Sequence, residues 1–213
     1  MISHEIAHQW FGNLVTMEWW DDISVNEAFA TWAENKPLAA WKPEWNMPLS
    51  DLQDTRRALA NDALRSTRAI RHKVDTADQI NEVFDAVAYE KTGGIVRMIE
   101  HYVGKDAFRA GIQSYLRKFG YSNAAGEDFW NELTRVTGKP VDRIMRSYVL
   151  QGGAPMLSTT QACAGGSTNV TNEQKRFAAS GASGAPQTWT LPVCAKSTAR
   201  DGVGGGVGGD AVC

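Results

Sequence analysis

Residues 3–12 have the sequence SHEIAHQWFG, and this stretch decides how the rest of the chain is interpreted. His4 and His8 are four positions apart, about 400° of rotation on an α-helix, so both imidazoles leave one face about 6 Å apart along the axis. Two neutral imidazoles on one face suit a tetrahedral zinc ion. Glu5 lies about 100° around the helix from His4, where its carboxylate can take a proton from a metal-bound water.

The third metal ligand must come from another element, and Glu27 is the candidate. Eighteen residues lie between His8 and Glu27, enough for a turn and a returning helix that brings the carboxylate opposite the histidines. The alternative is that His4 and His8 share a helix face by chance and bind no metal. We favour the metal site because two of the chain's four histidines have the required spacing. His72 and His101 have no such company and are predicted to be surface or packing residues.

Hydrophobic periodicity predicts that the chain is mainly α-helical as far as residue 152. The predicted helices cover residues 3–12, 24–33, 51–66, 81–103, 106–119, 126–136 and 141–150. We expect Ser24 or Asn26 to cap the second helix, a break in the fourth at Gly93-Gly94, and an extended segment at residues 17–22.

The composition changes near residue 152, after which Ser, Thr, Gly and Ala predominate. Alternating stretches at 168–171 and 187–193 predict two short strands, and the glycine-rich residues 202–209 are expected to be flexible. A few strands cannot bury a sheet alone. We therefore expect a helical domain over residues 1–152, followed over residues 153–213 by the start of a β-sandwich-like domain that is cut short.

Charge and hydropathy exclude some classes of partner. The formal net charge is −2 and no basic stripe occurs, which argues against nucleic acid. No apolar run approaches the roughly 18–20 residues that a membrane span needs, and no secretory signal is recognised. Cys163 and Cys194 are expected to bridge neighbouring strands, which would indicate an oxidising compartment; the alternative is two buried thiols. No prediction of compartment or oligomeric state follows.

Several segments together resemble the aminopeptidase N family of zinc aminopeptidases. The active-site segment of that family is matched by HEIAHQWFGNLVT at residues 4–16 and EWW at 18–20, its third-ligand segment by residues 26–30, and a tyrosine segment by FDAVAYEK at 84–91 and RM at 97–98. The resemblance covers residues 1 to about 152. It implies the helical lobe of a thermolysin-like metallopeptidase domain, followed by a short, truncated β segment.

The resemblance also implies roles for individual residues. One Zn²⁺ per chain would be held by His4, His8 and Glu27, with Glu5 as the general base and Tyr89 as the hydrogen-bond donor to the oxyanion. On the sequence alone, a tyrosine on an apolar helix is more simply a core residue with a satisfied hydroxyl. A zinc-bound imidazole usually donates its second N–H to a carboxylate, and the candidates are Glu18, Asp21 and Asp22.

The function implied is hydrolysis of peptides from their amino terminus. Two alternatives stay open: a zinc-binding fragment that is inactive alone, and an endopeptidase with the same metal site. Ser24 and Ala28 replace the family's usual aromatic and glycine, which should alter packing without removing the third ligand. The family's Gly-x-Met-Glu-Asn segment, whose glutamate receives the substrate's amino terminus, does not occur. We therefore expect a fragment with exposed apolar surface, weak stability, poor solubility and low activity.

Overall fold

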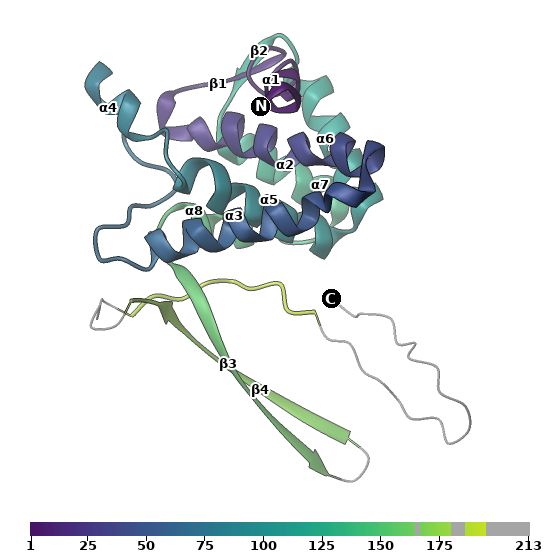
Figure 1. The fold of residues 1–213 in the computed structure, drawn as a ribbon, viewed down its shortest axis with the longest axis vertical. Coiled ribbons are helices and arrows are strands. Elements are labelled where there is room, and N and C mark those ends of the chain that lie inside the picture. The colour runs from purple at the N-terminus through teal and green to yellow at the C-terminus, as the bar shows by residue number, and fades with distance from the viewer. Residues whose placement is uncertain (165–166, 180–185, 195–213) are drawn as a thin grey trace.

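A computed structural model describes residues 1–164, 167–179 and 186–194. Over these residues the chain is mainly helical, with two small two-stranded sheets. The helices pack against one another, and a long β-hairpin projects from one side of them (Figure 1). The elements are α1 (Ile2–Ala7), β1 (Val15–Met17), η1 (Trp20–Asp22), α2 (Ile23–Trp41), η2 (Pro43–Trp45), α3 (Met47–Asp62), α4 (Ala77–Glu82), η3 (Val87–Lys91), α5 (Thr92–Val103), α6 (Lys105–Phe119), β2 (Ser122–Ala124), α7 (Gly126–Thr137), α8 (Val141–Val149), β3 (Ala154–Ala164) and β4 (Ser167–Phe177).

The first helix is shorter than predicted, but it still carries both histidines on one turn. α1 ends at Ala7, and His8 keeps helical backbone angles (φ −61°, ψ −16°) while its N–H donates to the carbonyl of His4 at 3.3 Å. The chain then turns back into β1, which pairs in parallel with β2 in the register Val15↔Ser122. The extended segment predicted at 17–22 is wrong in its second half, because η1 is a 3-10 turn there.

Helix α2 lies at the centre of the helical layer and is longer than predicted. It begins at Ile23 and continues through Pro37 to Trp41, so the predicted caps Ser24 and Asn26 lie inside it. The Phe29 side chain is fully buried, and its ring centroid is 4.6 Å from that of Phe11 and 4.4 Å from that of Phe129. This aromatic cluster ties α2 to the segment after α1 and to α7.

The predicted helix break at Gly93-Gly94 is wrong, because both glycines lie inside α5. A Cβ on Gly93 would come within 3.1 Å of the Thr31 methyl carbon, and a Cβ on Gly94 within 2.8 Å of the Thr55 methyl carbon. The two glycines therefore allow α5 to pack closely against α2 and α3. The helical pattern is interrupted earlier, between α4 and the π-helical turn η3.

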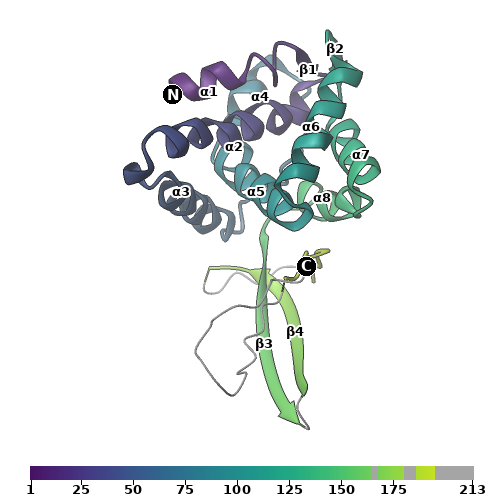
Figure 2. The same ribbon diagram turned by 90° about the vertical axis from the view of Figure 1, so that its right-hand side faces the viewer.

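The C-terminal part contains one antiparallel hairpin, β3 with β4, in the register Ala154↔Phe177. Figure 2 shows the hairpin as a narrow arm that extends away from the helices. The predicted strand 168–171 lies within β4, whereas 187–193 is not a strand. Cys163 is a free, exposed thiol, so the expected Cys163–Cys194 bridge is wrong. The glycine-rich stretch 202–209 lies outside the described residues.

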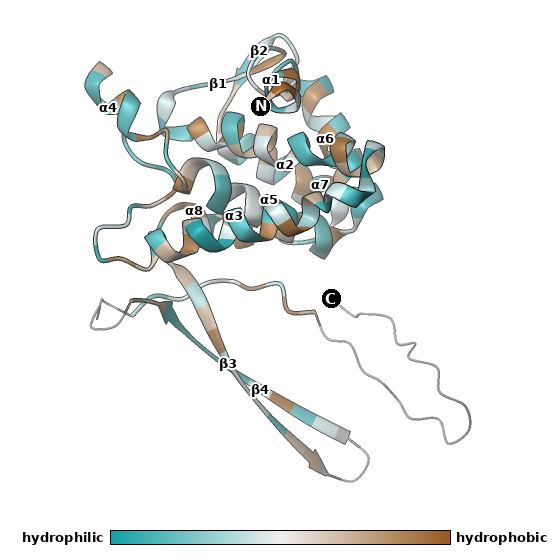
Figure 3. Ribbon diagram, viewed as in Figure 1, coloured by the Kyte–Doolittle hydropathy of each residue, from teal (hydrophilic) through white to brown (hydrophobic). Residues whose placement is uncertain are grey.

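Apolar side chains are exposed on α1, as the sequence led us to expect. Ile2 is 79 % exposed and Ile6 is 54 % exposed, and Figure 3 shows hydrophobic residues on this helix. Within the part of the chain that the structure covers, none of the helices has both the length and the apolar character needed to cross a bilayer.

Substitution Phe29→Ala tests whether α2 is the centre of the core. Removing a fully buried phenylalanine should lower the free energy of unfolding by about 3–5 kcal/mol, measured by urea denaturation. Leu52→Ala is the control, because Leu52 is 57 % exposed on α3, and it should change the free energy by less than about 0.5 kcal/mol. Equal effects of the two substitutions would contradict this description of the core.

Candidate metal centre

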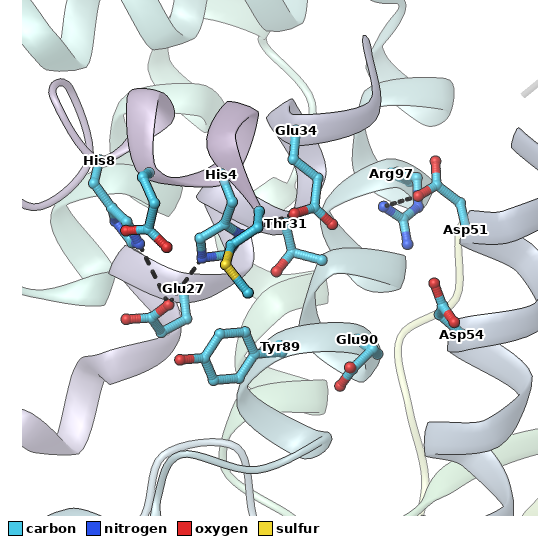
Figure 4. A pocket seen from close by; sticks show the side chains of 12 residues that line it. His4, His8, Glu27, Thr31, Glu34, Asp51, Asp54, Tyr89, Glu90 and Arg97 are labelled. Atoms are coloured by element: carbon cyan, nitrogen blue, oxygen red, sulfur yellow. Dashed lines mark hydrogen bonds and ion pairs between the residues drawn. The ribbon is translucent and has the colours of Figure 1, made fainter. Parts of the chain in front are cut away.

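His4 on α1 and His8, directly after α1, face Glu27 on α2, and three potential ligand atoms come together there (Figure 4). The Nε2 atom of His4 lies 3.2 Å from Oε2 of Glu27, and the Nε2 atom of His8 lies 3.5 Å from the same oxygen. All three ligand atoms lie within 4.8 Å of one another. The Glu27 side chain is 8 % exposed, so its carboxylate is held away from bulk water.

The other nitrogen of each ring also has an acceptor. Nδ1 of His4 is 3.0 Å from Oε2 of Glu34, and Nδ1 of His8 is 3.0 Å from the carbonyl oxygen of Phe11. A carbonyl oxygen only accepts, so His8 must donate from Nδ1–H. His4 lies between two carboxylates, because its Nε2 atom is also within hydrogen-bond distance of Glu27. With its proton on Nδ1, a neutral ring presents the Nε2 lone pair toward Glu27.

This arrangement fits a bound cation on electrostatic and geometric grounds. With both rings in that form, two imidazole lone pairs and a carboxylate oxygen point at one another. A cation among them would take the place of the proton through which His4 Nε2 otherwise contacts Glu27. With zinc bonds of about 2.0–2.1 Å, the ligand atoms of a tetrahedral site lie about 3.3–3.4 Å apart. The observed 3.2 and 3.5 Å from Glu27 to the two histidines bracket that value. The donor set of two imidazoles and one carboxylate is also one that zinc accepts.

The three candidate ligands, Glu5 and Tyr89 line one cavity of about 460 Å³. Glu5 is exposed on α1, and within the described residues its carboxylate makes no hydrogen bond or ion pair. Tyr89 lies on η3, and its ring stacks on that of His4 with centroids 5.9 Å apart and planes 19° apart. Burial and the nearby charge of Glu27 raise the pKa of the Tyr89 phenol above its usual value, so the hydroxyl stays protonated and can donate.

The three carboxylates that the sequence suggested as partners of His4 and His8 lie elsewhere. Asp22 binds Arg71 at 2.6 Å, Asp21 accepts from the backbone N–H of Val74 at 2.7 Å, and Glu18 is exposed. Asp21 and Asp22 anchor the start of α2 to the segment after α3.

The carboxylate partner of His4 is Glu34, which sequence reasoning missed. Glu34 follows Glu27 by seven positions, about 700° of helix, so the two side chains leave nearly the same face of α2. That spacing was readable in the sequence once Glu27 had been chosen as a ligand. His72 and His101 are both exposed, as predicted, and neither belongs to a potential metal-binding group among the described residues.

Comparison with known proteins identifies the family. The model of the peptidase family M1 domain matches residues 1–148. This range includes His4, Glu5, His8, Glu27 and Tyr89.

The chain belongs to peptidase family M1.

Similar proteins agree with this assignment. The chain is 42 % identical to the tricorn protease-interacting factor F2 of Thermoplasma volcanium over 90 % of its own length and 24 % of that protein. It is 41 % identical to a leucyl aminopeptidase of Saccharolobus solfataricus over 83 % of the chain and 22 % of that protein, and 38 % identical to aminopeptidase M1-A of Oryza sativa over 91 % and 21 %. The chain thus spans roughly a fifth to a quarter of the length of these curated relatives.

Substitution Glu34→Gln tests the role of the carboxylate behind His4. Removing the charge weakens the acceptor that orients the His4 ring, so zinc affinity should fall by about 10–100-fold, measured by competition with a chromogenic chelator. Glu44→Gln is the matched control, since Glu44 is an exposed carboxylate in the turn after α2, and it should leave the affinity unchanged. Wild-type affinity in Glu34→Gln would exclude this role.

Proposed function

We propose that this chain forms the metal-binding part of a zinc aminopeptidase, which hydrolyses peptide bonds and releases amino acids from the amino terminus. In this proposal His4, His8 and Glu27 hold one zinc ion. The observation that carries the proposal is that the three ligand atoms lie close together and that Glu5 and Tyr89 line the same cavity. Membership of family M1, which is zinc-dependent, supports the choice of metal.

Each side chain has a distinct task in the proposed reaction. When bound, zinc would lower the pKa of a water molecule and polarise the carbonyl of the scissile peptide. The Glu5 carboxylate accepts the proton that leaves the attacking water and later passes it to the departing amine. The Tyr89 hydroxyl, protonated at neutral pH, donates a hydrogen bond where negative charge develops on the carbonyl oxygen.

Two observations favour action at a free amino terminus over internal cleavage. Two of the relatives described above are aminopeptidases by name. The carboxylates of Asp51, Asp54 and Glu90 also line the cavity. Asp51 is paired with Arg97, which also lines the cavity, and Asp54 with Arg57. The remaining carboxylates leave an excess of negative charge, which favours a substrate ammonium over a neutral internal peptide. An endopeptidase with the same metal site is the second candidate.

We also propose a domain assignment that accompanies this function. Residues 1–152 would be the helical lobe of a thermolysin-like catalytic domain, and residues 153–213 the start of a β-sandwich-like domain. The family match to residue 148 and the end of α8 at Val149 support a boundary before β3, which starts at Ala154.

Turnover of leucine 4-nitroanilide by the zinc-loaded chain tests the proposal. Glu5→Gln should lower kcat by about 10²–10⁴-fold because the proton acceptor is lost. Tyr89→Phe should lower kcat by about 10²–10³-fold because an oxyanion donor is lost. Both variants should bind zinc as the wild type does, and Glu44→Gln should be fully active.

The outcomes separate the candidate functions. Zinc binding without any turnover would favour the non-enzymatic alternative, and equal cleavage of an amino-terminally acetylated peptide would favour an endopeptidase. Turnover that survives removal of zinc by a chelator would exclude the proposal altogether.

A further inference from the structure

The backbone that carries Tyr89 is unusual in its local geometry. Tyr89 lies on the π-helical turn η3, in which the N–H of Lys91 donates to the carbonyl of Ala86 at 3.0 Å. The Thr92 hydroxyl donates to the carbonyl of Val87 at 2.7 Å. A π-helical turn is rare and less stable than an α-helical turn, so contacts from outside the turn must hold it in place.

The first external contact is made by Asp85, just before the turn. Its Oδ1 atom accepts the backbone N–H groups of Val87 at 2.9 Å and Ala88 at 3.0 Å. The same carboxylate accepts two hydrogen bonds from Arg68, with Nη2 at 2.7 Å from Oδ1 and Nε at 3.0 Å from Oδ2. Such a two-point pair fixes the direction of the carboxylate as well as its position.

Arg68 is itself fixed by backbone acceptors. Its Nη1 donates to the carbonyls of Ala69 and Ile70, each at 2.9 Å, and its Nη2 donates to that of Val83 at 3.1 Å. The guanidinium therefore joins the loop after α3 to the start of the Tyr89 turn, and Asp85 cannot shift without breaking several hydrogen bonds.

The second contact is made by Lys91, the last residue of the turn. Its side chain is 2 % exposed, and Nζ lies 2.9 Å from Oδ2 of Asp62, whose side chain is fully buried. Nζ also donates to the carbonyl of Gly153 at 3.1 Å, and the Gly153 N–H donates to Oδ1 of Asp62 at 3.1 Å. The end of the turn is thereby attached to the end of α3 and to the residue before β3.

A buried ion pair contributes little net stability, because desolvation of the two charges opposes their attraction. It does define a geometry, since an unpaired buried charge is strongly disfavoured. A Tyr89 hydroxyl that stabilises an oxyanion must be held in place, because a displacement of about 1 Å can lower a rate by about 10²-fold. The buried Lys91–Asp62 pair imposes this constraint at the end of η3. At its start the Asp85 side chain is 37 % exposed, and the two-point pair with Arg68 sets the geometry there.

We propose that Asp85 and Lys91 are positioning residues that hold the π-helical turn and thereby fix the Tyr89 hydroxyl beside the His4–His8–Glu27 site. The inference rests on the proposed function of Tyr89. The competing interpretation is that the two ion pairs only stabilise the fold.

The first experiment measures the position of Tyr89 without any need for turnover. The five tyrosines are replaced by 3-fluorotyrosine, and the ¹⁹F resonance of Tyr89 is assigned from its loss in Tyr89→Phe. In the zinc-loaded chain, Asp85→Ala should shift and broaden this resonance and leave zinc stoichiometry at the wild-type value. An unchanged Tyr89 resonance in Asp85→Ala would overturn the proposal.

The control for this experiment is Glu132→Gln on α7. Glu132 is a buried carboxylate 2.6 Å from Arg135, so this variant also loses a charge pair, but one that does not contact η3. Its Tyr89 resonance should be that of the wild type. A shift as large as that in Asp85→Ala would mean that general destabilisation moves Tyr89, which also overturns the proposal.

The second experiment is a double-mutant cycle on kcat with leucine 4-nitroanilide. A residue that acts through Tyr89 loses its effect when Tyr89 is already disabled. Asp85→Ala should therefore lower kcat by up to about 10²-fold in the wild type, with KM little changed, and should have almost no effect on top of Tyr89→Phe. Equal losses in both backgrounds would support the merely structural role.

If Asp85→Ala does not fold, the double substitution Lys91→Met with Asp62→Leu takes its place in both experiments. It replaces the buried pair by apolar side chains of similar size, which proteins often tolerate. If the wild-type chain shows no turnover, the proposed function fails, and the ¹⁹F resonance alone decides whether Asp85 and Lys91 position Tyr89.

Discussion

The proposed chemistry of this protein depends on one contact, in which a carboxylate oxygen of Glu27 faces the Nε2 atoms of His4 and His8. Two imidazole nitrogens and a carboxylate held this close away from water need a proton or a metal ion between them. The surrounding structure holds them in place. Glu34 and the carbonyl of Phe11 hold the two rings from behind, and the low exposure of Glu27 leaves its carboxylate few other partners. Such a preformed arrangement is what a metal site requires.

The aromatic core explains how the segment that carries the histidines and the helix that carries Glu27 are held together. Phe29 is two positions after Glu27 and points into the opposite side of α2, where it packs on Phe11 and Phe129. Because Phe11 follows His8 by three residues, one packed cluster fixes the ends of both ligand-bearing segments. The position of the histidines relative to Glu27 is thus a consequence of apolar burial, and the polar site adds direction to it.

Local spacing was enough to predict that His4 and His8 lie close together, because their separation sets their geometry within one turn of helix. Long-range contacts were harder to predict. Gly93 and Gly94 were interpreted as a break, although their lack of a side chain serves close packing of α5 on Thr31 and Thr55. The partner of His4 was sought near the histidines and lies on α2, and the π-helical turn under Tyr89 has no signature in hydrophobic periodicity. The expected disulfide between Cys163 and Cys194 was wrong. It assumed two neighbouring strands, but residues 187–193 do not form a strand.

The central claim is that His4, His8 and Glu27 hold zinc. X-ray absorption at the zinc edge of the zinc-loaded chain tests it most directly. The account predicts nitrogen and oxygen neighbours at about 2.0–2.2 Å, with the multiple scattering of two imidazoles, of which one is lost in His8→Ala. A sulfur neighbour at about 2.3 Å, or a spectrum that His8→Ala leaves unchanged, would contradict it.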